Sequence, residues 1–165
     1  MLLRLLWILI TGFASICVNA QCKIKNRVNA DGTMFYYMDP VQFYKTSERQ
    51  LRGNVTTDRD NYFLSFLPAP FPAKPGGFKL KKNVSVKLSN DKVYILEHYD
   101  SRYLEDSVLI LMFELKKAYI ADFRKYEVEQ VVLNMGDKEG PRVYDLKLYR
   151  SAVIEGLNCF MKKEE

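Results

Sequence analysis

The stretch FKLKKNVSVKL at residues 78–88 decides the fold class of this chain. Its even-numbered positions are apolar except for Lys82, and its odd-numbered positions are all polar. An alternation with a period of two is typical of a β-strand with one buried face, and a bulge at Lys82 would accommodate the exception. Turn-forming residues at 89–92 and a second apolar segment at 93–99 follow, so the sequence predicts a β-hairpin.

Five further segments have strand-like patterns and are separated by short turns. They are residues 33–38, 62–67, 107–115, 126–135 and 143–149, the last with Tyr144, Leu146 and Leu148 pointing inward. Helical periodicity is weak, and only residues 41–51 and one turn at 151–157 are compatible with a helix. We therefore expect an all-β fold with at most minor helix. The expected architecture is an antiparallel β-sandwich or barrel of about seven to nine strands, closed by a terminal disulfide.

Residues 1–20 have the pattern of a cleaved secretory signal peptide. Arg4 supplies the positive charge, an apolar run follows, and Val18 and Ala20 occupy the small-residue positions of a cleavage site. The apolar run is shorter than the roughly 20 residues that a membrane-spanning helix needs. We expect a single β-rich domain over residues 21–165, secreted or in the lumen of the secretory pathway, with no membrane span.

The cysteines fit the same compartment. The chain has three, and removal of the signal peptide takes Cys17 with it. Cys22 and Cys159 remain at the two ends of the mature domain, and an isolated pair in an oxidising compartment usually forms a disulfide. Two unpaired buried thiols are the alternative. The spacing matches no zinc-binding pattern, so we expect no metal site and no cofactor.

Two N-glycosylation sequons also agree with secretion. They begin at Asn54 and Asn83, and we expect at least one to carry a glycan. Asn54 falls in a polar segment, residues 45–60, which we expect to be a loop. Asn83 falls on the polar side of the alternating strand at 78–88.

Charge and composition exclude several classes of function. The net charge of +5 arises from 25 basic and 20 acidic residues that are interspersed, which argues against a nucleic-acid partner. The chain has one histidine, His98, and no Gly-x-Ser-x-Gly turn that could present a nucleophile. We therefore expect no catalytic residues and no enzymatic activity.

A proline-rich segment at residues 67–77 is the candidate partner-binding loop. Prolines stiffen it, so an aromatic side chain displayed there would lose little entropy on binding. Pro70, Phe71, Pro72 and Lys74 are the candidate binding residues. The alternative is that Phe71 caps the core from one end.

These observations favour a secreted, non-enzymatic binding module that recognises an extracellular protein or glycan through loops at one end of the fold. The alternative is a carrier of a small hydrophobic ligand in a barrel or sandwich cavity. Such a carrier would be like a lipocalin in role only, because the Gly-x-Trp feature of lipocalins is missing. The chain's one tryptophan, Trp7, is lost with the signal peptide.

Overall fold

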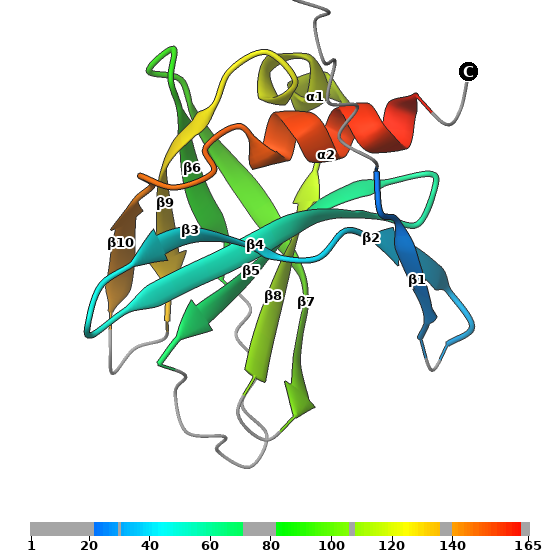
Figure 1. Cartoon of the computed structure of the whole chain (residues 1–165), viewed down its shortest axis with the longest axis horizontal. Coiled ribbons are helices and arrows are strands. Elements are labelled where there is room, and N and C mark those ends of the chain that lie inside the picture. The colour runs from blue at the N-terminus through cyan, green and yellow to red at the C-terminus, as the bar shows by residue number, and fades with distance from the viewer. Residues whose placement is uncertain (1–21, 30, 71–81, 106–107, 136–139, 163–165) are drawn as a thin grey trace, which may run out of the picture.

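The computed structural model describes residues 22–29, 31–70, 82–105, 108–135 and 140–162, which form ten β-strands and two α-helices (Figure 1). The strands are β1 (Lys25–Val28), β2 (Met34–Tyr37), β3 (Val41–Lys45), β4 (Gln50–Thr57), β5 (Tyr62–Ala69), β6 (Val84–Leu88), β7 (Val93–Glu105), β8 (Val108–Leu115), β9 (Val128–Asn134) and β10 (Pro141–Asp145). The helices are α1 (Lys117–Phe123) and α2 (Ala152–Met161).

The predicted hairpin is confirmed as β6 and β7, which pair antiparallel through the turn at 89–92. Val84, Val86 and Leu88 are buried, whereas Ser85 and Lys87 face outward, as the alternation requires. The strand begins at Val84, so Lys82 precedes it and forms no bulge within it. Residues 78–81 of the expected strand lie outside the described residues.

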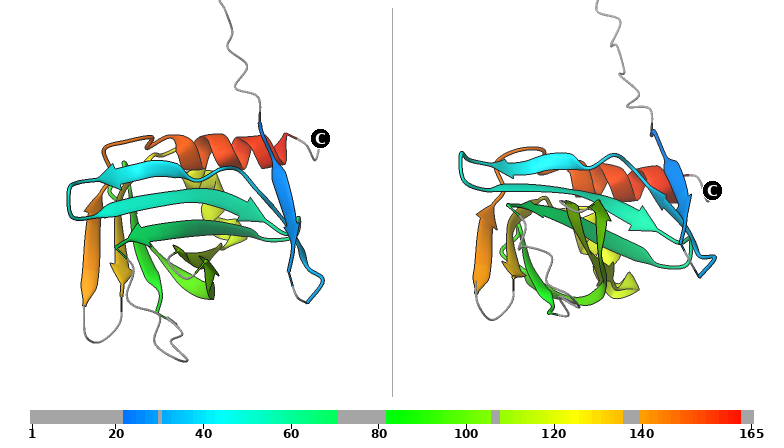
Figure 2. Two further views of the ribbon diagram at one scale, coloured as in Figure 1. Left: turned by 60° about the horizontal axis from the view of Figure 1, so that its bottom comes forward. Right: turned by 90° about the horizontal axis from the view of Figure 1, so that it is seen from below.

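All strands join into one antiparallel sheet in the order β1-β2-β4-β5-β8-β7-β6-β9-β10, and β3 also pairs with β4. The long strand β7 connects its two halves, because residues 93–96 pair with β6 and the remainder pairs with β8. Figures 1 and 2 show the sheet curling, so that β6, β9 and β10 run across the direction of β4 and β5. The antiparallel β class is confirmed, and the sheet is open rather than a closed barrel.

The segment after β10 nevertheless reaches the β3 edge. The backbone amides of Lys147 and Leu148 both donate to the carbonyl oxygen of Phe43 at 3.3 Å. The rings of Tyr44 and Tyr144 meet edge-to-face with centroids 5.4 Å apart. These contacts hold β3 and β10 close together although they share no strand pairing.

The sequence prediction of a helix at residues 41–51 is wrong, and so is the prediction of a loop at 45–60. Residues 41–57 form β3, a turn and β4, which raises the number of strands to ten. The apolar residues Phe43, Leu51 and Val55 enter the core, and the polar residues between them pair with a neighbouring strand. Tertiary pairing therefore overrides the weak local pattern.

The two helices pack on the inner face of the curled sheet. Helix α1, which the sequence did not predict, buries Ile120 and Phe123. The single turn expected at 151–157 is instead the start of α2, which runs to Met161 and packs against β4. Their apolar residues join the main core, a cluster that includes Phe66, Phe113 and Leu157.

The sequence prediction for the last strand is correct in part. Tyr144 and Leu146 are buried, but Leu148 is 41% exposed because β10 ends at Asp145 and the chain turns away.

The predicted disulfide is confirmed. Cys22 and Cys159 are bonded with their Cα atoms 5.6 Å apart, which ties the segment before β1 to the last turn of α2.

Candidate partner-binding surface

Only part of the predicted binding loop lies within the described residues. Pro70 follows the end of β5 and is exposed, and its carbonyl oxygen accepts a hydrogen bond from Arg142 Nη1 at 2.8 Å. Phe71, Pro72 and Lys74 lie outside the described residues, so the aromatic anchor stays a prediction.

The two sequons lie in different surroundings. Asn54 is in β4 and half-buried, and its Nδ2 donates to the carbonyl oxygen of Met38. Asn83 is exposed just before β6, and its Oδ1 accepts a hydrogen bond from the backbone of His98 at 3.2 Å. The ring of His98, which is half-buried, packs edge-to-face against Phe113 with the ring centroids 5.9 Å apart.

One feature that the sequence did not reveal is a mostly apolar row on the outer face of β7, β6, β9 and β10. We call it the outer row: Ile95, Ser85, Val132 and Val143, which lie opposite one another in four neighbouring strands. Ile95 is 54% exposed and Val143 is 47% exposed. Val93, two residues before Ile95 on β7, adds a further apolar side chain at 58% exposure.

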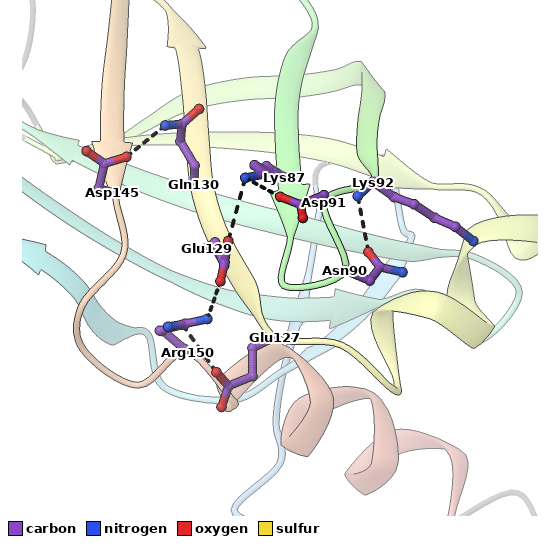
Figure 3. A network of polar contacts seen from close by, with 9 residues as sticks. All are labelled: Lys87, Asn90, Asp91, Lys92, Glu127, Glu129, Gln130, Asp145 and Arg150. Atoms are coloured by element: carbon purple, nitrogen blue, oxygen red, sulfur yellow. Dashed lines mark hydrogen bonds and ion pairs between the residues drawn. The ribbon is translucent and has the colours of Figure 1, made fainter.

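A band of charged and polar side chains lies beside the outer row, since Lys87 follows Ser85 by two residues in β6 and pairs with Gln130 of β9. Figure 3 shows the contacts within this band. We call it the charged rim: Lys87, Asp91, Glu127, Glu129, Gln130, Asp145 and Arg150. Lys87 Nζ lies 2.7 Å from Asp91 and 3.8 Å from Glu129. Arg150 continues the chain of contacts, with Glu129 at 2.8 Å and Glu127 at 3.2 Å.

A β-bulge in β9 positions two side chains of this rim, those of Glu129 and Gln130. Lys87 pairs with Gln130 and Leu88 pairs with Val128, so Glu129 is the extra residue between them. A bulge places two successive side chains on nearly the same side of the strand. Glu129 therefore contacts Lys87 and Arg150, while Gln130 Nε2 donates to Asp145 at 2.7 Å.

The charged groups of the rim hold one another in place. The hydrogen bond to Asp91 raises the pKa of Lys87, and the same bond lowers the pKa of Asp91. The two cations, Lys87 and Arg150, each lie between two carboxylates and share Glu129, so that three carboxylates stand against these two cations. Asp91 projects furthest, with its side chain 85% exposed. A hollow of about 250 Å³ beside them is lined by Lys87, Glu129, Gln130, Asp145, Leu146, Lys147 and Arg150.

Pairing between strands explains why sequence reasoning missed this surface. Val93, Ile95, Val132 and Val143 each sit in a segment with correct alternation, but their alignment on one face depends on strand order and register. An outward-facing valine or isoleucine at several strand positions was the one available signal.

The part of the chain that the structure describes contains no group of three or more histidine, cysteine, aspartate or glutamate side chains that could hold a metal ion. None of its helices is long and apolar enough to cross a membrane. Comparison of the chain with protein-family models, with curated proteins and with solved structures finds no match.

Proposed function

We propose that this chain is a secreted, non-enzymatic binding module that recognises an extracellular protein through the outer row and its charged rim. The observation that supports this most is the alignment of Ile95, Val132 and Val143 on one sheet face, where Ile95 and Val143 are exposed. Protein interfaces commonly combine an apolar centre with a polar, solvent-accessible border. The signal-like residues 1–20 and the disulfide are compatible with export.

The rim suggests the chemistry of the partner. Carboxylates outnumber the cations of the rim's ion pairs, and the most exposed of them, Asp91, is in the best position to meet an incoming surface. A partner with an apolar centre bordered by lysine or arginine would complement this arrangement. The electrostatic part of such recognition acts mainly on the association rate and weakens as salt increases.

The packing of the main core favours this function over a carrier of a hydrophobic ligand. Phe43, Phe66 and Phe113 from the sheet and Leu157 from α2 fill the inner side of the curl and are almost wholly buried. A carrier would need its ligand to replace such side chains. Ile95 and Val143 of the outer row, in contrast, are already exposed.

Capture of the partner by the mature, disulfide-bonded protein tests this function. A photo-reactive side chain at Ser85, in the middle of the outer row, should cross-link the partner. The substitutions Ile95→Lys and Val143→Lys, made separately in that protein, should abolish the adduct. Each substitution puts a cation among the apolar contacts with the partner. Neither should change the free energy of unfolding by more than about 0.5 kcal/mol.

Val28→Lys is the matched control. Val28 is 62% exposed on β1, at the opposite end of the strand order from β10. The proposal requires that this variant keep the adduct. Equal loss of the adduct with all three variants, or no loss with any, would overturn the assignment of binding to the outer row.

A further inference from the structure

A second cavity lies on a different part of the sheet, between the β1–β2 hairpin and the outer side of β4, β5 and β8. Its volume is about 190 Å³. Its lining consists of Arg27, Tyr37, Pro40, Asn54, Thr56, Ser65, Leu67 and Ile110. We call it the hairpin cavity. We propose that it binds a small organic carboxylate with a short apolar body, a ligand independent of the protein partner proposed above.

The cationic side of the hairpin cavity is Arg27. Its guanidinium lies over the rings of Phe35 and Tyr37, at 5.9 and 5.4 Å from their centroids, and its Nη2 is 3.6 Å from Met112 Sδ. Among the described residues it forms no ion pair, and Nε has no hydrogen-bond partner. Burial lowers the pKa of Arg27, so its charge is stabilised less than that of a fully solvated arginine.

Partly buried cations usually have an anionic partner, since desolvation is otherwise uncompensated. Arg102 increases the local positive charge, because its Nη2 also lies 3.9 Å from Met112 Sδ. The carboxylate near these two arginines is that of Asp100, 4.0 Å from Arg102 Nε. A carboxylate ligand would supply the anion that Arg27 lacks, and would fit its planar set of donors.

The floor of the hairpin cavity supplies additional hydrogen-bonding groups. The hydroxyls of Thr56 and Ser65 are buried and 3.1 Å apart, and either one can be the donor. Two hydroxyls carry two protons, and the bond between them uses one, so one proton is available to a ligand. Asn54 also lines the cavity, and its Oδ1 is buried without a partner among the described residues.

The apolar side and the volume limit the size of the ligand. Leu67 and Ile110 are buried members of the outer cluster formed by Phe35, Phe63, Leu67, Ile110 and Met112. A volume of 190 Å³ equals that of roughly six water molecules and is below the range for drug-sized ligands. These features fit an acid of the size of 4-hydroxybenzoate, with its carboxylate at Arg27 and its ring against Leu67 and Ile110.

Titration of the unglycosylated, disulfide-bonded protein with 4-hydroxybenzoate tests the proposal by NMR, which observes the Nε–H of Arg27 directly. We expect a saturable shift of that signal. We also expect binding at least about tenfold weaker for the uncharged analogue 4-hydroxybenzamide, because a charge-assisted hydrogen bond is lost. Arg27→Gln should weaken binding of the acid by a similar factor.

Lys125→Gln is the matched control, because it removes the same charge from a lysine that lies over the ring of Tyr126, beyond α1. This variant should bind 4-hydroxybenzoate with an affinity within about twofold of the wild-type value. Thr56→Val is a second test that remains informative if Arg27→Gln fails to fold. It removes a hydroxyl and keeps the charge of Arg27, and it should also weaken binding of the acid. Absence of a shift with the acid, equal binding of acid and amide, or full affinity in both Arg27→Gln and Thr56→Val would overturn the proposal.

Discussion

Gly156 lies where α2 packs directly against Val55 of β4. A Cβ atom at this position would lie 2.9 Å from Val55 Cγ2 and 3.1 Å from Val55 Cβ. Alanine in place of a helical glycine normally stabilises by up to about 1 kcal/mol. Here overpacking dominates, so Gly156→Ala should lower the free energy of unfolding by about 1–2 kcal/mol in urea denaturation.

A double-mutant cycle separates this contact from helix propensity. Val55→Ala alone should destabilise by creating a cavity, but in the Val55→Ala background the added methyl group of Gly156→Ala has space. The two substitutions should therefore cost less together than the sum of their separate effects, by about 1 kcal/mol. Simple additivity would contradict the close approach.

The two sequons also differ at the residue scale. Asn83 is exposed, whereas Asn54 is half-buried on the floor of the hairpin cavity beside the buried Thr56. We expect a glycan on Asn83 and none on Asn54, because a glycan attached to Asn54 would have to pass through that cavity to reach the solvent. Asn83→Gln should remove the whole mass shift that glycosidase treatment produces, and Asn54→Gln should leave it unchanged. The reverse pattern would show that the cavity holds a glycan instead of a small acid.

At the scale of elements, alternation predicted those strands whose polar side chains face water. It succeeded for β6, where Ser85 and Lys87 face outward. It failed for β4, because Asn54 and Thr56 are polar but point into contacts with Met38 and Ser65 that only the folded chain creates. The outer row and the hairpin cavity were beyond prediction for the same reason, since both depend on which strands become neighbours.

The disulfide is the clearest energetic feature at this scale. It closes a loop with a sequence separation of 137 residues, for which loss of chain entropy in the unfolded state amounts to about 5 kcal/mol at most. The variant Cys22→Ser/Cys159→Ser should therefore have a free energy of unfolding lower by about 2–5 kcal/mol. Urea denaturation with and without a reducing agent measures this. The reducing agent should destabilise the wild type and leave the double variant unchanged, and equal stability of the two oxidised proteins would contradict the prediction.

At the scale of the whole molecule, exposed ion pairs on several elements contribute to the dependence of stability on pH. Lys92 and Asp122, 2.8 Å apart, connect the turn before β7 to α1. The hydrogen bond from Lys92 is the main cause that lowers the pKa of Asp122 below the usual 3.8, and the same bond raises the pKa of Lys92 above 10.5. Similar shifts occur in Lys87 and Asp91 on the opposite side of the turn between β6 and β7.

The signs of these shifts predict a plateau of stability with a decline at each end. An aspartate with a lowered folded-state pKa stabilises fully above its unfolded pKa, and this contribution is lost as pH falls through the folded value. A lysine with a raised pKa stabilises the fold fully below its unfolded-state pKa, and its contribution is lost as pH rises through the folded-state value.

The Tm difference between wild type and Asp122→Asn should thus be constant from about pH 5 to 9 and vanish in acid below the lowered pKa of Asp122. Molar salt should reduce the difference because both groups are exposed. Asp60→Asn is the matched control, since its carboxylate is in no ion pair among the described residues, and it should leave Tm nearly unchanged. A Tm difference for Asp122→Asn that persisted in strong acid would show that the substitution acts through packing near Tyr94 and not through the charge of Asp122.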